Sequence, residues 1–365
     1  MQKTKLRKYT FNIVLLFVVL LFCFAVLEIT VRLISPSLFH PDILLQPHLN
    51  LVYNVNLSGV SPLIHHTTNK LGFRGDPFPK NIEEYNFILT IGGSTTLCFY
   101  LDDTKTWPTL LQKKLRESSD PSVLVQNAGL DGHSTRGHLL VMQYVVPKVK
   151  PNTIIMLVGV NDLGNSLDKR RFEEGNKFEK VPFIYKLFSY SRVLQILYSW
   201  KQTLFGEVTL THQSNTNLVL LPLEHEDSLS EGFQKELVSL PEYEHNLKTI
   251  TQMAKDMHIR LIFVTHPLLF SDDKNWSSVQ ATGLGLSQMS YNISAQTYAK
   301  MLNIFNKRLL DVCHETSTEC IDLANLMPHE NKYFYDAVHF NEAGSEFVAQ
   351  TIQNYITEHE KNNTR

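Results

Sequence analysis

Four short polar segments, far apart along the chain, carry the residue types of a serine-based acyl-transfer site. The segments are GGSTT with Ser94, NAGLDGHST with Gly129, GVNDLG with Asn161, and YFYDAVHFNEAG with Asp336 and His339. A serine hydroxyl is a weak nucleophile until a base removes its proton. A carboxylate that orients the base makes this proton transfer more effective. Asp336 and His339 are three residues apart, so one segment could supply both the carboxylate and the base.

An acyl transfer also needs hydrogen-bond donors that face the oxygen on which negative charge develops. The backbone N–H groups of Ser94 and Gly129 and the side-chain amide of Asn161 could supply three such donors. One donor of this kind lowers the activation barrier by about 2.7–4 kcal/mol. The residue types therefore favour a nucleophile, a base with its carboxylate, and an oxyanion hole.

Each segment taken alone has a second interpretation. The turn GGSTT could bind phosphate, but it has neither the GxxxxGK[ST] nor the GxGxxG pattern, and no Lys or Arg stands in it. Ser94 alone is more typical of a turn or a helix cap, and Asp336 and His339 could cap the helix that follows them. The nucleophile interpretation depends on the four segments together.

Other polar residues are expected to have structural roles. Asp162, next to Asn161, is expected to bond nearby backbone. The remaining candidate bases lack a carboxylate at the Asp-x-x-His spacing, so we expect them in surface or loop positions, with His266 bordering the site because it ends a strand. They are His65, His66, His133, His138 and His266.

Each of the four segments follows a predicted strand. Apolar runs predict strands at 86–91, 122–127, 153–160, 259–267 and 320–326, and helical periodicity predicts helices at 107–118, 134–149, 241–257, 294–315 and 341–359. Strands that alternate with helices form a parallel sheet through right-handed crossovers. Functional groups gather at the carboxyl edge of such a sheet. The predicted fold class is α/β, a three-layer α/β/α sandwich with a central parallel sheet.

The four segments resemble, in the same order, the sequence blocks of the SGNH or GDSL-type serine hydrolases. ILTIGGST is similar to the nucleophile block, NAGLDG to the oxyanion glycine block, VGVND to the oxyanion asparagine block, and DAVHFNEAG to the Asp-x-x-His block. The resemblance implies a flavodoxin-like fold, Ser94 as nucleophile, His339 as base, Asp336 as its orienting carboxylate, and Gly129 and Asn161 as oxyanion donors.

Two further segments bear on the resemblance. The family's name motif has Asp before the serine, whereas Gly93 stands there in this chain, and that difference leaves the subfamily and substrate open. The segment NKLGFRGDPF, which begins at Asn69, is similar to the lead-in of membrane-anchored bacterial members.

The N-terminus is the clearest break in composition. Four basic residues in MQKTKLRKYT precede an apolar run at 11–27, and a helix extended to Ile34 reaches the roughly 30 Å of a bilayer core. We predict an uncleaved single-pass anchor with its basic end in the cytoplasm, so the catalytic domain lies outside it, periplasmic or extracellular. A cleaved signal peptide is the alternative, because Cys23 and Ala25 form a small-x-small site.

The chain is expected to divide at these composition changes. The predicted parts are a cytoplasmic tip and transmembrane helix (1–35), an irregular linker and lead-in (36–85), a hydrolase domain (86–358) that contains a helical insertion or cap (165–241), and a tail (359–365). Cys313 and Cys320 are the only close cysteine pair and are expected either to form a disulfide or to remain two free thiols.

The composition limits the kinds of ligand and partner that we expect this protein to bind. The net charge of −2 and the absence of a basic stripe argue against nucleic acid, and no CxxC or HExxH spacing suggests a metal site. No cofactor is expected. The sequence predicts a serine esterase that cleaves an acyl ester of an O-acetylated glycan or a lipid. An O-acyltransferase on exported glycan and a catalytically idle member that binds a glycan or a partner remain the alternatives.

Overall fold

A five-stranded parallel sheet forms the centre of the fold. The computed structural model describes residues 2–34, 43, 45–118, 120–167, 191–194, 196–197, 209–211, 237–271 and 295–363. The strands, in the spatial order β4-β3-β5-β7-β8, are β4 (Val123–Asn127), β3 (Asn86–Gly92), β5 (Thr153–Leu157), β7 (Arg260–Val264) and β8 (Glu319–Ile321). Every adjacent pair is parallel, which confirms the predicted sheet.

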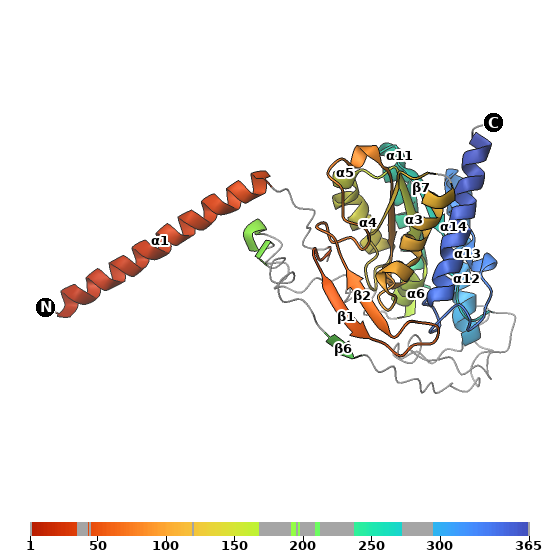
Figure 1. The fold of residues 1–365 in the computed structure, drawn as a ribbon, viewed down its shortest axis with the longest axis horizontal. Helices are drawn as coiled ribbons and strands as arrows, with labels where there is room; N and C mark the ends of the chain where they lie inside the picture. Colours follow the sequence, from red (N-terminus) through yellow and green to blue (C-terminus); the bar gives the residue numbers. More distant parts are fainter. Residues whose placement is uncertain are drawn as a thin grey trace.

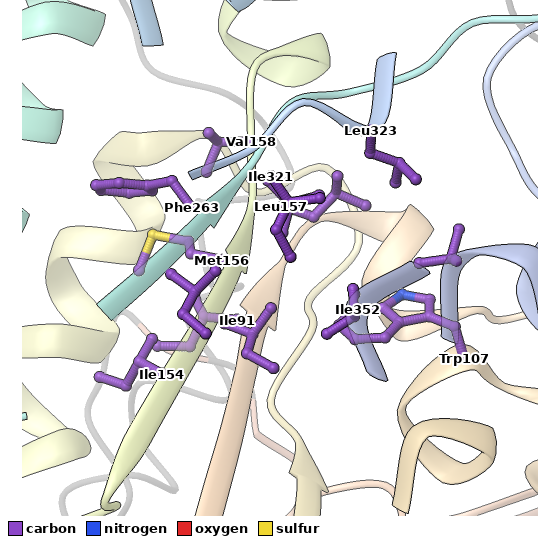
Figure 2. Close-up of a cluster of buried hydrophobic side chains, with 14 of the residues drawn as sticks. Ile91, Trp107, Ile154, Met156, Leu157, Val158, Phe263, Ile321, Leu323 and Ile352 are labelled. Carbon is purple, nitrogen blue, oxygen red and sulfur yellow. The ribbon is translucent and has the colours of Figure 1, made fainter. Parts of the chain in front are cut away.

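Helices cover both faces of this sheet and make three layers. They are α3 (Trp107–Ser118), α4 (Thr135–Tyr144), α5 (Val146–Val149), α11 (Leu240–Asp256), α12 (Ala295–Thr316) and α14 (Glu342–Asn363). Helix α14 packs on α3, and α11 packs on both α4 and α12 (Figure 1). Figure 2 shows Met156 and Phe263 on one side of the sheet and Trp107 and Ile352 on the other. Strands covered on both faces are apolar almost throughout, as β5 is.

Short helices follow the carboxyl ends of three strands: α2 (Ser94–Leu97), α6 (Val160–Leu167) and α13 (Leu323–Leu326). The 3-10 turn η1 (Ile82–Glu84) precedes β3, and η2 (Asp103–Lys105) lies between α2 and α3. The strand predicted at 320–326 is wrong in its second half, because the chain turns at Asp322 and Leu323–Leu326 is helical. Asp322 and the good helix formers after it are the local reason.

The lead-in is more ordered than the predicted linker at 36–85. Strands β1 (Asn50–Asn54) and β2 (Leu63–Thr67) pair as an antiparallel hairpin, and β6 (Thr209–Thr211) adds to β1 in parallel. Ile43, Leu45 and Phe73 are buried in the main core. Five-residue strands among prolines carry too little periodicity to be recognised from the sequence alone.

The insertion predicted at 165–241 lies mostly outside the described residues. Its described parts include the end of α6, the strand β6 and the first residues of α11, so Thr209–Thr211 is a strand where a helical insertion was predicted. The reason is its pairing with β1, a contact between segments far apart in the sequence.

Helix α1 (Gln2–Ile34) projects from the rest of the chain (Figure 1). By length and composition, Tyr9–Leu33, with a mean hydropathy of 3.0, is able to cross a membrane, a test that a signal sequence also passes. Near its end, the Glu28 carboxylate accepts hydrogen bonds from Ser191 Oγ at 2.8 Å and from the backbone N–H of Arg192 at 2.7 Å.

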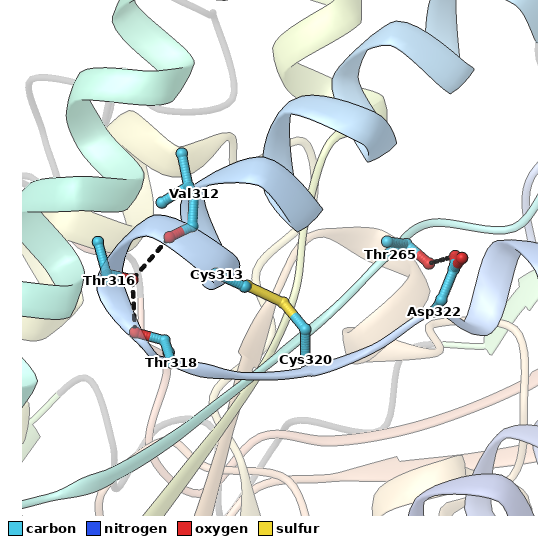
Figure 3. Close-up of a disulfide and its surroundings, with 7 residues drawn as sticks. All are labelled: Thr265, Val312, Cys313, Thr316, Thr318, Cys320 and Asp322. Carbon is cyan, nitrogen blue, oxygen red and sulfur yellow. Dashed lines mark hydrogen bonds between the residues drawn. A yellow bond between two sulfur atoms is a disulfide. The ribbon is translucent and has the colours of Figure 1, made fainter.

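Cys313 and Cys320 form a disulfide, so the first of the two alternatives is confirmed. The bond ties the last turns of α12 to β8 (Figure 3). Beside it, Thr316 Oγ donates a hydrogen bond to the Val312 carbonyl at 2.7 Å and lies 2.8 Å from Thr318 Oγ. The edge strand β8 is therefore fastened to the helix that precedes it.

Candidate active site

Three of the predicted site residues form one hydrogen-bonded chain. Ser94 Oγ lies 2.7 Å from His339 Nε2, and His339 Nδ1 lies 2.7 Å from Asp336 Oδ2. Ser94 begins the helix that follows β3, whereas Asp336 and His339 lie in the loop between α13 and α14. The structure brings together residues that are 245 positions apart in the sequence.

The buried Asp336 carboxylate determines the protonation of His339. Its Oδ1 accepts the backbone N–H groups of Val338 at 2.9 Å and of His339 at 2.7 Å, and only 1% of its side chain is exposed. An ionised carboxylate can only accept, so Nδ1 of His339 carries the hydrogen and Nε2 accepts from Ser94 Oγ. Burial is the largest single influence on His339 and would lower its pKa, but the charge of Asp336, its hydrogen bond to the ring and the charge of Asp131 together raise that pKa above its usual value.

The turn at Gly93 explains the departure from the family motif. Gly93 has φ −85° and ψ −151°, an extended conformation open to any residue. A Cβ at this position would lie 2.3 Å from Asn161 Nδ2 and 3.2 Å from the carbonyl of His133. The Asn161 amide therefore occupies the space that a side chain before Ser94 would need.

Two of the three predicted oxyanion donors remain available in this arrangement. The N–H of Ser94 belongs to the first turn of α2, where backbone N–H groups have no partner within the helix. Asn161 Nδ2 donates one hydrogen to the His133 carbonyl at 3.0 Å, which leaves the second hydrogen of the amide. Both groups lie at the turn that carries Ser94.

Gly129 lies against helix α2, but its N–H is engaged within its own loop. That N–H donates to Asn127 Oδ1 at 2.8 Å. A Cβ on Gly129 would lie 2.4 Å from the backbone nitrogen of Leu97 and 2.8 Å from the carbonyl carbon of Thr96. The observed reason for glycine here is thus the close approach of helix α2, and the expected donor is engaged within its own loop.

Asp162 bonds nearby backbone, as predicted. Its Oδ1 accepts the backbone N–H of Thr135 at 3.0 Å and the Thr135 hydroxyl at 2.6 Å, and the residue is 4% exposed. Asn246 Nδ2 donates to the same hydroxyl at 3.0 Å. Asp162 thereby joins the loop after β4 to the helix that carries Asn161.

Three of the other histidines lie in surface or loop positions, as expected: His65 is exposed, and His133 and His266 lie in loops. The expectation is wrong for His66, which is buried in β2, and for His138, which is buried in α4. The two loop histidines are buried as well. His65 is exposed and lies 2.9 Å from Asp102 Oδ2. Burial lowers the pKa of His138 to about 3 and the pKa of His266 to about 3. A neutral histidine ring can be buried where residues far apart in the sequence pack around it. The spacing of residues along the chain does not predict such burial.

His266 borders the site, as predicted, through the residue after the nucleophile. Its Nδ1 lies 2.7 Å from the Pro267 carbonyl, which can only accept, so Nε2 accepts from the Thr95 hydroxyl at 3.2 Å. Its ring also stacks on Phe340, the residue after His339, at 6.3 Å. On its other side His266 lines a cavity of about 310 Å³, together with Leu268, Phe270, Ser271, Ala299, Leu302, Asn303, Ala324, Asn325 and His329.

Sequence reasoning missed two side chains that hold the nucleophile segment. Trp107 is fully buried and its Nε1 donates to the Thr95 carbonyl at 3.1 Å. Arg74 comes from the lead-in and bonds the carbonyls of Leu97 and Cys98. The lead-in motif was the one signal for Arg74. In the part of the chain that the structure describes, no cluster of His, Cys, Asp and Glu could hold a metal ion.

Most of the chain matches one known protein family. The family model described as the GDSL-like Lipase/Acylhydrolase family matches residues 89–347. No curated protein matches the chain.

Solved structures with a similar fold include an acetyl xylan esterase, AlAXEase, at 14% identity, 74% coverage of this chain, 99% of that one, and a TM-score of 0.41. Axe2, an acetylxylan esterase from Geobacillus stearothermophilus, is 14% identical, and the match covers 74% of this chain and 93% of Axe2 with a TM-score of 0.41. LAE5, an alpha/beta hydrolase enzyme from the metagenome of Lake Arreo, Spain, has 12% identity, coverage of 73% and 93%, and a TM-score of 0.43. The match to the family model spans most of the chain, which therefore belongs to the GDSL-like lipase/acylhydrolase family and is an SGNH-type esterase that acts on ester bonds.

Proposed function

We propose that Ser94, His339 and Asp336 are the catalytic triad of this esterase. The hydrogen-bonded chain from Ser94 Oγ through the His339 ring to the buried Asp336 carboxylate is the observation that carries the proposal. In this arrangement His339 Nε2 is already the acceptor of the Ser94 hydroxyl hydrogen. The group next to the nucleophile is thus in the protonation state that a general base needs.

The reaction proceeds in two halves. Ser94 Oγ bonds to the ester carbonyl carbon while its proton passes to His339 Nε2, and the tetrahedral intermediate collapses as His339 returns that proton to the leaving alcohol. Water then attacks the acyl-enzyme and gives its proton to His339, and His339 returns that proton to Ser94 Oγ as the bond to the acyl carbon breaks and the acid is released. Asp336 keeps its negative charge and stabilises the imidazolium formed in each half.

The oxyanion hole is proposed to consist mainly of the Ser94 N–H and the second amide hydrogen of Asn161. Both belong to groups fixed beside the nucleophile, the first by helix α2 and the second by the bond to the His133 carbonyl. The N–H of Gly129 now bonds Asn127 Oδ1, and one hydrogen cannot make straight bonds to two acceptors. Gly129 becomes a third donor to the oxyanion only if its N–H leaves Asn127.

The substrate is proposed to be an acyl ester on a glycan or a lipid outside the cytoplasm. The basic residues at the start of helix α1 favour a cytoplasmic N-terminus, and the Cys313–Cys320 disulfide suits an oxidising compartment. An acyl-enzyme also reacts with acceptors other than water. Release of free acetate from acetylated xylan supports hydrolysis, and acetate recovered on an added glycan acceptor supports transfer instead.

Labelling with a fluorophosphonate probe tests the proposed nucleophile. Wild type is expected to be labelled and to hydrolyse p-nitrophenyl acetate, and Ser94→Ala is expected to lose both properties because the attacking oxygen is gone. Ser122→Ala is the matched control, since Ser122 Oγ is also hydrogen-bonded to a side chain, but that side chain is the Asp120 carboxylate at 2.6 Å and not a histidine. A folded wild-type protein that never reacts with the probe would refute the proposal and favour the idle, binding-only alternative.

The pH profile of kcat/KM is expected to show an acid limb with its midpoint above pH 6.5. The base acts only when neutral, so activity is lost as pH falls through the pKa of His339, which Asp336 raises from 6.5. Rates measured from pH 4 to pH 9 with p-nitrophenyl acetate test this expectation. A profile flat down to pH 4 would show that another group is the base.

A further inference from the structure

Arg74 bonds the carboxyl end of the nucleophile helix, although it lies outside the stretch that matches the family model. Only 1% of its side chain is exposed. Nη1 donates to the carbonyls of Leu97 at 2.9 Å and Cys98 at 2.6 Å, and Nη2 donates to the carbonyl of Leu101. One buried guanidinium thus bonds three carbonyl oxygens at and after the end of the helix that begins with Ser94.

These carbonyls need such a partner because helix α2 is so short. It has four residues, and the chain leaves it through Cys98 with φ 54°, a left-handed conformation. The last carbonyls of a helix have no partner within it, and a single turn is not stable in isolation. A positive charge at a helix carboxyl end also interacts favourably with the helix dipole. Arg74 therefore supplies what the sequence of α2 lacks.

The backbone of Arg74 is fixed to the same region. Its N–H and its carbonyl pair with the carbonyl and N–H of Asn127, each at 3.0 Å. The Asn127 side chain donates to the Thr96 carbonyl at 2.7 Å and accepts the N–H of Gly129 at 2.8 Å. The side chains of Arg74 and Asn127 together bond four carbonyls, those of Thr96, Leu97, Cys98 and Leu101.

The guanidinium itself is oriented by Asp103. Its Nε lies 2.6 Å from Asp103 Oδ1, while Asp103 Oδ2 accepts the N–H of Thr67 at 2.9 Å and its hydroxyl at 2.6 Å. Asp103 belongs to η2 and Thr67 to β2, so the hairpin of the lead-in takes part in the contact. A lysine would keep the positive charge, but all its donor hydrogens are on one nitrogen. It cannot reproduce the planar arrangement of donors with which arginine bonds several carbonyls.

We propose that Arg74 is a positioning residue for the nucleophile, which rests on the proposed role of Ser94. A helix of four residues is roughly 6 Å long, so a shift of its carboxyl end moves Ser94 at the other end. Arg74 contacts three carbonyls of this turn and acts on Ser94 only through them. Misplacement of a reacting group by about 1 Å can cost on the order of a hundredfold in rate.

Arg74→Lys and Arg116→Lys in the full chain test the proposal. Arg116 is the matched control because it also contacts the lead-in, Asp76 at 3.3 Å, and a backbone carbonyl, Val123 at 2.8 Å, but not helix α2. Arg74→Lys is expected to lower kcat for p-nitrophenyl acetate by about tenfold to a hundredfold with KM unchanged. Its fluorophosphonate labelling rate should fall in parallel, while its kinetic pKa stays that of wild type, because the contacts of His339 and Asp336 are intact. Arg116→Lys should behave as wild type.

The kcat per probe-titrated site separates positioning from a merely structural role. A folded Arg74→Lys variant with wild-type kcat per titrated site would overturn the proposal. If that variant does not fold, Asp103→Asn replaces it: a lowered kcat with an unchanged melting temperature supports the proposal, and a wild-type kcat overturns it. A wild-type protein that the probe never labels would instead remove the role of Ser94, on which the proposal rests.

Discussion

Asp336→Asn is expected to lower kcat by about 10⁴-fold while leaving the fold intact. In the native site Oδ1 of Asp336 accepts two backbone N–H groups and Oδ2 accepts the Nδ1–H of His339. An asparagine keeps its oxygen toward the two backbone donors, so its NH₂ group faces Nδ1. Nδ1 must then be the acceptor, which transfers the ring hydrogen to Nε2. His339 would thus present a hydrogen to Ser94 and could not remove its proton.

The measurement is kcat with p-nitrophenyl acetate, combined with a thermal melt. Asp120→Asn is the control, because Asp120 Oδ1 likewise accepts the N–H of the residue two positions later, Ser122 at 2.8 Å, but contacts no histidine. The control should retain wild-type activity. If Asp336→Asn kept a wild-type kcat, the carboxylate would not determine the hydrogen position on His339.

Gly93→Asp, which restores the name motif of the family, is expected to lower kcat by about 10²–10³-fold rather than to improve it. The conformation of Gly93 would accept aspartate, so the cost is one of space. A Cβ there would meet Asn161 Nδ2 at 2.3 Å, and the carboxylate would extend from it. Asn161 would be pushed from the place where its second hydrogen can reach the oxyanion.

A double-mutant cycle tests whether the effect runs through Asn161. Gly93→Ala and Asn161→Ala should each lower kcat, and the double variant should be little worse than either, because both remove the same donor. Melting temperatures separate a local effect from unfolding. Additive losses, or a Gly93→Asp variant more active than wild type, would contradict the steric explanation.

The sheet and the meeting of Ser94 with Asp336 and His339 could be predicted from the sequence for physical reasons. Buried parallel strands are continuous apolar runs, and β5 at Thr153–Leu157 is one. The sequence alone predicts that Ser94 lies near Asp336 and His339, because the carboxyl ends of parallel strands lie at the same edge of the sheet.

What could not be predicted depends on contacts between segments far apart in the sequence. Arg74 receives its role from the carbonyls of Leu97 and Cys98, and neither partner marks the other in the sequence. The engagement of Gly129 N–H by Asn127 and the burial of His138 are of the same kind. The identity of Gly93 also became explicable only when Asn161 was found against it.

The contacts of the lead-in determine where a soluble form of this enzyme has to begin. A fragment cut at the start of β3 would keep Ser94, Asp336, His339 and the whole stretch that matches the family model. It would nevertheless lose Arg74, the hairpin β1–β2 and the buried Ile43 and Leu45. A fragment without helix α1 that begins before Ile43 retains all of them and is the better starting point for expression and crystallisation.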